Sequence, residues 1–309
     1  MRNAFAREIE DLAALDERVV LLSGDIGNRI FNSFKERFPD RFYNCGIAEA
    51  NMMSVAAGLA MCNLRPVAYT ITPFITVRCL EQIRLDVCYH QAPVTIVGVG
   101  AGFSYASLGA THHSCEDIAY MRLLPNMSVL CPGDPFEVRG ALRSILAQDG
   151  PAYLRIGKKG EPTIHASIPD IEIGRAIVMA EGETVCILST GNLLPIAIEA
   201  GQNLSASGIS TRVCSVHTVK PLDEALLEEV FGSFRIVVTL EEHLAIGGLG
   251  GSVAEWVSGR PWPAARLLRI GAPVDFIHEA GCQSYYRQRL GLDPAGVVEK
   301  IQRLLGELT

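Results

Sequence analysis

Early in the chain the sequence reads Gly46-Ile47-Ala48-Glu49-Ala50-Asn51-Met52-Met53-Ser54-Val55-Ala56-Ala57-Gly58-Leu59-Ala60. From Glu49 onward this segment has the composition of a helix that is apolar on nearly every face, and such a helix has to be buried. A short strand that ends near Cys45 precedes it. The segment therefore predicts a strand followed by a buried helix, which is the basic unit of an α/β fold.

Short apolar runs and helical segments alternate through the rest of the chain. Runs of strand length, rich in β-branched residues, cover Val19–Leu22, Pro66–Ile71, Val94–Val99, Met127–Leu130, Ala152–Arg155, Val185–Ser189, Thr211–Val216, Arg235–Leu240 and Leu267–Ile270. Segments with helical spacing cover Asn3–Leu15, Glu49–Met61, Phe74–Tyr89, Pro135–Ala147, Leu193–Ser205, Asp223–Phe231 and Gly251–Ser258. This alternation predicts an α/β fold with two domains, each a mostly parallel sheet covered by helices on both faces.

One stretch with little periodicity divides this pattern. It contains glycines and prolines that are typical of a linker, at Gly157, Gly160, Pro162, Pro169 and Gly174. We expect a first domain over residues 1–157, a linker over 158–174 and a second domain over 175–309. The length of 309 residues is ordinary for two such domains.

Charge and apolar content limit the classes of partner. Lys and Arg total 27 against 34 Asp and Glu, which gives a formal net charge of −7. An acidic chain repels a polyphosphate, so nucleic acid is not expected as a partner.

The apolar runs are only of strand length and the N-terminus lacks a signal-peptide core, so we expect a cytoplasmic protein without a membrane span. The nine cysteines form no Cys-x-x-Cys pair and are interpreted as reduced core residues.

Glu49 is the first candidate functional residue, because it is the only charged residue between Arg41 and Arg65. It can serve simply as an acid that interacts with the N-terminal dipole of its helix. Burial favours a functional interpretation, since a carboxyl group among apolar neighbours tends to stay protonated unless a partner compensates. Carboxyl groups of that kind concentrate at functional sites. The residues alone leave both interpretations open.

The pair His112-His113 is the second candidate. It follows the apolar run Val94–Val99 and the glycine-rich loop Gly100-Ala101-Gly102. Loops at the carboxyl ends of parallel strands form the ligand crevice of α/β sheets. As an alternative, the two histidines are a pair on a surface loop or belong to the N-cap region of the helix that begins at Ser114. Adjacent histidines point in different directions and have no third ligand here, so we expect no metal site in this chain.

Together these segments resemble the C-terminal half of transketolases. The Gly46–Ala60 segment is similar to their pyrimidine-binding motif, and their Gly-Pro-Thr-His loop is matched by Gly109-Ala110-Thr111-His112. The signature of their C-terminal domain is matched by Glu241-Glu242-His243 followed by Gly247-Gly248-Leu249-Gly250-Gly251-Ser252. The chain also resembles 1-deoxy-D-xylulose-5-phosphate synthases and, more distantly, the beta subunits of 2-oxoacid dehydrogenases.

A complete transketolase has a further N-terminal domain that anchors the cofactor diphosphate through Mg²⁺. The nearest match to its Gly-Asp-Gly signature is Gly24-Asp25-Ile26-Gly27, in which isoleucine takes the third position. The chain therefore resembles a separate subunit of a split transketolase. This resemblance implies thiamine diphosphate as cofactor, a partner chain that binds the diphosphate and Mg²⁺, and homodimerisation that gives an α2β2 assembly.

The resemblance also implies roles for individual residues. Glu49 matches the glutamate that hydrogen-bonds the aminopyrimidine ring, and His112 matches a histidine that contacts substrate hydroxyls. The other candidates are Phe74 and Asp25 for the cofactor, and His113, Arg78, Arg155 and Arg29 for the substrate, with Arg2 as a further cation. In the second domain the glycine-rich turn with Glu242 and His243 is expected to be structural, and His217 is expected to be a core or interface residue.

Two departures from the family concern the substrate. Leu108 stands where transketolases have an aspartate, and Gly100 replaces a histidine that contacts phosphate. The implied reaction transfers a two-carbon ketol unit from a ketose or ketose phosphate to an aldehyde, and the departures suggest an acceptor other than the usual aldose phosphates. The alternatives are a decarboxylating subunit, similar to deoxyxylulose phosphate synthase or to a 2-oxoacid dehydrogenase beta subunit, and a non-catalytic partner subunit.

Overall fold

Two sheets form the frame of the computed structural model, which describes residues 1–26, 28–261 and 264–308. The first sheet has seven strands in the order β10-β5-β6-β4-β3-β1-β2, and the second has five in the order β12-β11-β8-β9-β7. The strands are β1 (Val19–Ser23), β2 (Phe42–Asn44), β3 (Arg65–Ile71), β4 (Thr95–Val99), β5 (Ser128–Leu130), β6 (Ala152–Ile156), β7 (Ile177–Ala180), β8 (Val185–Thr190), β9 (Thr211–Ser215), β10 (Thr218–Lys220), β11 (Ile236–Leu244) and β12 (Arg266–Ala272). All pairs are parallel except β10 with β5 and β7 with β9, so the predicted fold class is confirmed.

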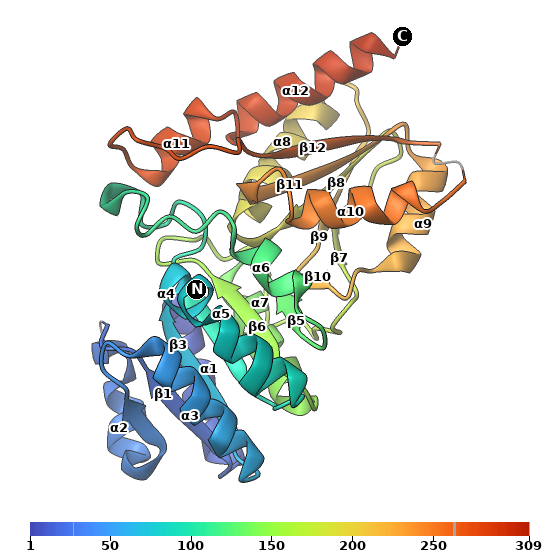
Figure 1. Cartoon of the computed structure of the whole chain (residues 1–309). Helices are drawn as coiled ribbons and strands as arrows, with labels where there is room; N and C mark the ends of the chain where they lie inside the picture. The colour runs from blue at the N-terminus through green and yellow to red at the C-terminus, as the bar shows by residue number, and fades with distance from the viewer. Residues whose placement is uncertain (27, 262–263, 309) are drawn as a thin grey trace.

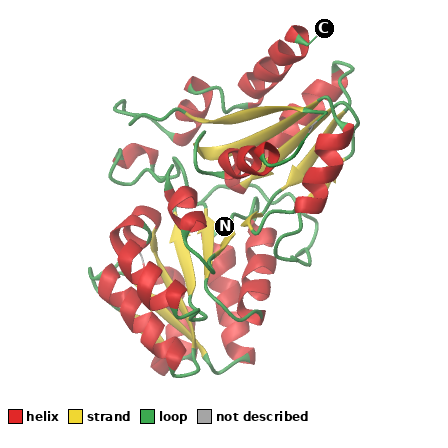
Figure 2. Ribbon diagram, turned by 45° about the vertical axis from the view of Figure 1, so that its right-hand side comes forward, coloured by secondary structure: helices red, strands yellow, loops and turns green. Residues whose placement is uncertain are grey.

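Helices cover both faces of each sheet, as Figures 1 and 2 show. Successive strand residues point to opposite faces, so Leu21 packs in one apolar cluster with α1 and α7, whereas Leu22 packs with Met52 of α3 on the other face. The α-helices are α1 (Arg2–Leu15), α2 (Asn32–Arg37), α3 (Glu49–Met61), α4 (Thr72–Ile75), α5 (Leu80–Gln82), α6 (Asp117–Leu123), α7 (Pro135–Ala147), α8 (Leu194–Ala206), α9 (Glu224–Ser233), α10 (Leu249–Ser258), α11 (Gln283–Arg289) and α12 (Pro294–Glu307). In the second domain α8 and α12 pack on one face of the sheet, and α9 and α10 lie on the other.

The segment 74–89 differs from the single helix that its spacing predicts. It is divided into the end of α4, a 3₁₀ turn at Val77–Cys79, α5, and wide helical turns over Ile83–Tyr89. The break falls at Thr76, whose backbone has φ −99° and ψ −87° and whose hydroxyl donates to the Thr72 carbonyl at 2.7 Å. The prediction of a continuous helix was wrong because the local bonding of Thr76 ends the first turn.

Strand β10 crosses from the second part of the chain to the first sheet. It follows β9, yet it pairs antiparallel with β5, and the Cys131 N–H donates to the His217 carbonyl at 2.7 Å. His217 itself is buried, as expected of a core residue. This exchange was not predicted, because a run as short as Thr218–Lys220 has no measurable period. Among the described residues, the chain between Ile156 and Ile177 forms neither helix nor strand.

Candidate active site

The main candidate residues gather where the strands of the first sheet end. Glu49 is the first residue of α3, Phe74 lies in α4 directly after β3, and His112 lies in the loop after β4. In parallel sheets, this edge forms the ligand crevice. Figure 1 shows α4 and the loop after β4 on the side of the first sheet that faces the second domain.

Glu49 is a buried carboxylate with an arginine as its partner. The residue is 5% exposed, and Met52 and Met53 of the same helix are fully buried. Arg78 donates from Nη1 to Glu49 Oε2 at 2.8 Å. Within the described ranges, this is the one side-chain hydrogen bond that Glu49 makes. The position at the start of a helix also favours the negative charge.

Aromatic contacts connect this ion pair to His112. The Arg78 Cζ atom lies 4.4 Å from the centroid of the Phe74 ring, and the His112 ring packs edge-on against Phe74 at 5.2 Å. On its other side, His112 lies 5.9 Å from the ring of Tyr105. We call this contacting set the crevice group: Glu49, Arg78, Phe74, His112 and Tyr105.

His112 is held in a form that suits proton transfer. Its Nδ1 lies 2.9 Å from the hydroxyl oxygen of Thr111. Burial lowers the pKa of His112, and the positive charges of His113 and Lys158 lower it further. The imidazole is therefore neutral near pH 7, and it can accept a proton from a hydroxyl group.

His113 lies apart from its neighbour. Its Nε2 lies 3.2 Å from the Ala106 carbonyl oxygen, and its ring packs edge-on against Phe103 and Tyr286, each at 5.5 Å. Tyr286 belongs to α11 of the second domain. His113 thus contacts the second domain, and its expected substrate role stays a prediction.

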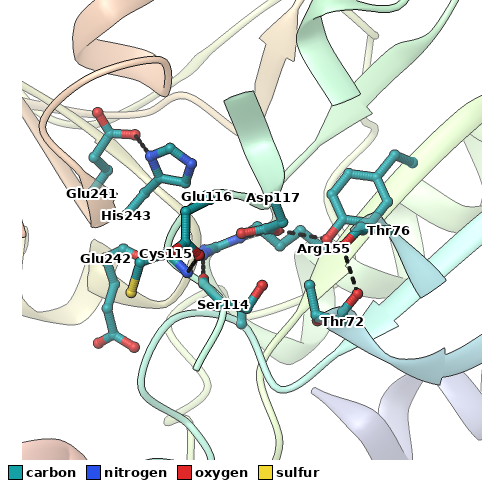
Figure 3. Close-up of polar contacts among 12 residues, drawn as sticks. Thr72, Thr76, Ser114, Cys115, Glu116, Asp117, Arg155, Glu241, Glu242 and His243 are labelled. Atoms are coloured by element: carbon teal, nitrogen blue, oxygen red, sulfur yellow. Dashed lines mark hydrogen bonds and ion pairs between the residues drawn. The ribbon is translucent and has the colours of Figure 1, made fainter. Parts of the chain in front are cut away.

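Arg155 is buried between the two domains. Its side chain is 1% exposed, and its Nε donates to Asp117 Oδ2 at 2.7 Å. Its Nη2 donates to the carbonyl oxygens of Ser114 and Glu242, each at 2.9 Å. Figure 3 shows Arg155 beside the Ser114–Asp117 segment, with the Glu241–His243 segment on the other side of that segment in this view. The guanidinium thus contacts acceptors of both domains, and the expected substrate role of Arg155 stays a prediction.

Asp25 and Arg29 lie after β1, and both are exposed. Asp25 accepts a hydrogen bond from Asn44 Nδ2 at 3.0 Å and donates its N–H to the Gly46 carbonyl. Neither residue belongs to the crevice group, and their cofactor and substrate roles stay predictions. Gly27, which the sequence interpretation placed in the same turn, lies outside the described residues.

Lys158 and Tyr105 were missed by the sequence interpretation. Lys158 Nζ lies 4.2 Å from the centroid of the Tyr105 ring, next to His112. Tyr105 can lie there because Gly100, at φ +93°, has no Cβ; a Cβ atom would be 2.1 Å from the ring. The glycine at position 100, where the family has a histidine, was therefore the one feature of the sequence that indicated a side chain packed at this point.

Arg2 adds a further positive charge to this end of the crevice. Burial lowers the pKa of Lys158, and the charges of Lys159 and Arg2 lower it further. The Arg2 Nε is buried and has no hydrogen-bond partner in the described part of the chain. This end of the crevice can therefore hold an anion.

The Glu241-Glu242-His243 segment of β11 holds the two domains together. Glu241 accepts the N–H groups of Leu249 and Gly250, each at 2.8 Å, so the glycine-rich turn is capped by the protein's own carboxylate. Glu242 Oε1 accepts from the Phe103 N–H at 2.8 Å, and its Oε2 accepts from Arg287. His243 Nε2 accepts from the Ala119 N–H at 3.4 Å. These contacts agree with the expected structural role.

The described residues contain no group of three side chains suited to a metal ion, and none of their helices is long and apolar enough to span a membrane. All nine cysteines are free, and six of them are buried. Cys45 is half-buried, and Cys62 and Cys282 are exposed, which the interpretation as core residues did not anticipate.

Two family descriptions match the chain. The transketolase pyrimidine-binding domain matches residues 1–161, and the transketolase C-terminal domain matches residues 174–297. These matches cover the parts of the chain that carry the crevice group and the Glu241–His243 segment.

Related proteins agree with this assignment. The chain is 35% identical to a protein described as a transketolase C-terminal section from Methanocaldococcus jannaschii, over 97% of this chain and 95% of that protein. It is also 35% identical to a 6-deoxy-6-sulfo-D-fructose transketolase subunit from Clostridium sp., over 96% of this chain and 92% of the subunit. A 1-deoxy-D-xylulose-5-phosphate synthase from Azoarcus sp. is 34% identical over 94% of this chain, but the match spans only 46% of the synthase.

Solved structures give the same result. A structure described as a split-gene transketolase, an inactive β4 tetramer, superposes with a TM-score of 0.89 at 35% identity, over 98% of this chain and 96% of that chain. A transketolase from Pichia stipitis shares the fold, with a TM-score of 0.78 at 19% identity, over 96% of this chain and 45% of that chain. The chain therefore belongs to the transketolase family, as a separate subunit of the C-terminal type.

Proposed function

We propose that this chain contributes Glu49, Phe74 and His112 to a transketolase active site that a second polypeptide completes. The observation that carries the proposal is the crevice group at the carboxyl ends of the strands of the first sheet. In this group Arg78 contacts both the buried carboxylate of Glu49 and the Phe74 ring, and the Phe74 ring packs against the neutral His112. In this proposal a separate N-terminal-type subunit binds the diphosphate and supplies the Mg²⁺ ligands. Two copies of each chain form an α2β2 assembly.

The residues present fit the pyrimidine part of thiamine diphosphate, the cofactor that transketolase membership implies. A carboxylate that is 5% exposed can share a proton with a ring nitrogen without competition from water, and the half-buried Phe74 ring can stack on a planar heterocycle. When bound, thiamine diphosphate supplies the carbon that carries the two-carbon unit. Glu49 orients the ring and holds a proton at its nitrogen.

The substrate in this proposal is a sugar with an anionic group. Arg2 and Lys158 attract the anion, while the neutral His112 accepts a proton from a hydroxyl group of the sugar. The names of two relatives support an anionic substrate, since one is a 6-deoxy-6-sulfo-D-fructose transketolase subunit and another is an apulose-4-phosphate transketolase subunit.

The test is an assay of the chain with the partner subunit that co-purifies with it. With thiamine diphosphate and Mg²⁺ added, we expect ketol transfer from a ketose phosphate or a sugar sulfonate. The similarity to deoxyxylulose phosphate synthases favours one alternative, in which pyruvate is the donor. Release of CO₂ from pyruvate without ketol transfer would replace our proposal by that alternative.

A further inference from the structure

Arg78 contacts both groups that we assign to the pyrimidine ring. Its Nη1 donates to Glu49 Oε2 at 2.8 Å, and its Cζ lies 4.4 Å from the centroid of the Phe74 ring. The guanidinium therefore takes up the hydrogen-bonding position at the carboxylate and lies over the aromatic ring at the same time.

A guanidinium and an aminopyrimidine share the features that matter at such a site. Both are planar, both present N–H donors in the plane, and both stack on aromatic rings. We propose that Arg78 occupies the place of the cofactor ring in the free subunit and has to leave it when thiamine diphosphate binds. This inference rests on the proposed function of Glu49 and Phe74.

The structure shows why Arg78 can leave and Glu49 cannot. The Arg78 side chain is 46% exposed, so its charge regains water when it turns outward, whereas the Glu49 side chain is only 6% exposed. Arg78 also belongs to a short 3₁₀ turn next to the backbone break at Thr76, not to a long helix.

The free subunit needs a partner for Glu49. A buried carboxylate without a hydrogen-bonding partner is costly, and Arg78 removes that cost before the cofactor arrives. Cofactor binding then exchanges one partner of Glu49 for another. The free energy of the Arg78–Glu49 contact is lost when the cofactor binds. It therefore weakens cofactor binding, because the binding free energy is the difference between the cofactor-bound and the cofactor-free protein. Once released, Arg78 is free for the substrate contact that the sequence predicts.

The experiment is calorimetric titration of the assembled enzyme, this chain with its partner subunit, with thiamine diphosphate in the presence of Mg²⁺ and without substrate. Arg78→Met removes the charge and the donors but keeps an unbranched side chain. We expect it to bind the cofactor about tenfold more tightly than the wild type, and we expect Arg78→Lys, which keeps a charge but loses the planar group, to lie between the two.

Arg84→Met is the matched control. Arg84 is exposed, lies six positions further along the same segment, and makes no ion pair among the described residues. We expect its cofactor affinity to equal that of the wild type.

The outcomes separate this inference from the proposed function. If the wild type binds the cofactor but both Arg78 variants bind it equally or more weakly, Arg78 does not occupy the ring position and the inference fails alone. If the wild type and every variant fail to bind, the proposed function fails. Should Arg78→Met not fold, Arg78→Lys decides the matter by the same comparison.

Discussion

Two arginine–carboxylate pairs in this molecule have the same local design but differ in their surroundings. In each, the carboxylate is the first residue of a helix, Glu49 of α3 or Asp117 of α6. Arg78 bonds Glu49 at 2.8 Å, and Arg155 bonds Asp117 at 2.7 Å. The difference lies in the surroundings, since the Arg78 side chain is 46% exposed and the Arg155 side chain is 1% exposed.

The buried pair is fixed because further protein groups complete it. The Tyr153 hydroxyl donates to Asp117 at 2.6 Å, and Arg155 also bonds carbonyl groups of Ser114 and Glu242. Glu49 has only the exposed Arg78 as a side-chain donor within the described ranges. The Asp117 Oδ1 atom has no hydrogen-bond partner among the residues that the structure describes, but it is buried inside the protein, whereas the partner of Glu49 is exposed and can be displaced. Burial of the carboxylate alone therefore does not distinguish the two pairs; the exposure of its arginine partner does.

The largest expected effect comes from breaking the removable pair at its carboxylate. Glu49→Gln keeps the size of the side chain but cannot carry the shared proton. We expect kcat for ketol transfer to fall by about 10²–10⁴-fold, the range for loss of a positioned acid or base, while the free energy of unfolding changes by less than about 1 kcal/mol. Steady-state kinetics and denaturant unfolding measure the two quantities.

Glu81→Gln is the control for this variant, because Glu81 is an exposed acid on the neighbouring α5. Its activity should match that of the wild type. Near-normal turnover in Glu49→Gln would instead support a non-catalytic role for this chain.

Removing the Arg155–Asp117 pair should mainly reduce stability, whereas Glu49→Gln should mainly reduce activity. Arg155→Met leaves Asp117 buried without its counter-charge, so we expect the free energy of unfolding to fall by about 3–5 kcal/mol, as for other buried pairs that lose one partner. Denaturant titration of the free subunit measures this loss. Arg18→Met, which removes an exposed pair with Asp16, should leave the free energy of unfolding nearly unchanged. An equally small effect of Arg155→Met would contradict an interdomain role.

The contrast also explains what could be predicted from the sequence. Glu49 became a candidate because a lone charge in an apolar helix is visible in a linear pattern, and most strands of the two sheets were predicted from their apolar runs, but β7 and β10 were not. Arg155 could not be placed, since its acceptors at Ser114 and Glu242 are 41 and 87 positions away along the chain. Nothing local distinguishes a guanidinium that faces solvent from one that tertiary contacts enclose.

The same limit applies to segments whose form depends on packing. Strand β10 pairs with the edge of β5, which lies far from it along the chain. The predicted helix over 74–89 breaks at Thr76, where the backbone turns and the hydroxyl donates to the Thr72 carbonyl. The ring of Tyr105 contacts both Lys158 and His112 and so brings them near each other. Tyr105 can lie there only because Gly100 has no Cβ atom.

Lys158 is a cation at the crevice that lacks the enclosing contacts of Arg155. We expect Lys158→Met to raise KM for a phosphorylated or sulfonated substrate about tenfold, in the range for loss of a charged hydrogen bond, with little change in kcat. Glycolaldehyde, an acceptor without an anionic group, should be used equally well by the variant and the wild type. Lys159→Met is the control, since Lys159 is exposed and points to no aromatic partner that the structure describes. An equal rise in KM for glycolaldehyde would show that Lys158 acts on the fold of the crevice and not on the anion.

The smallest expected effect is a shift in pH dependence at His112. Burial and the charges of His113 and Lys158 lower its pKa, so the neutral, proton-accepting form persists to a pH below the ordinary value of 6.5. If His112 accepts a proton from the substrate, kcat/KM should fall as the pH drops, with its midpoint below pH 6.5. Removing a neighbouring positive charge relieves part of that shift, so Lys158→Met should move this midpoint upward, toward 6.5. The test is the pH profile of kcat/KM for glycolaldehyde in the two proteins, because this acceptor separates the effect on His112 from the effect on anion binding. A midpoint that moves downward, or not at all, would show that the charge of Lys158 does not reach His112 through the Tyr105 contact.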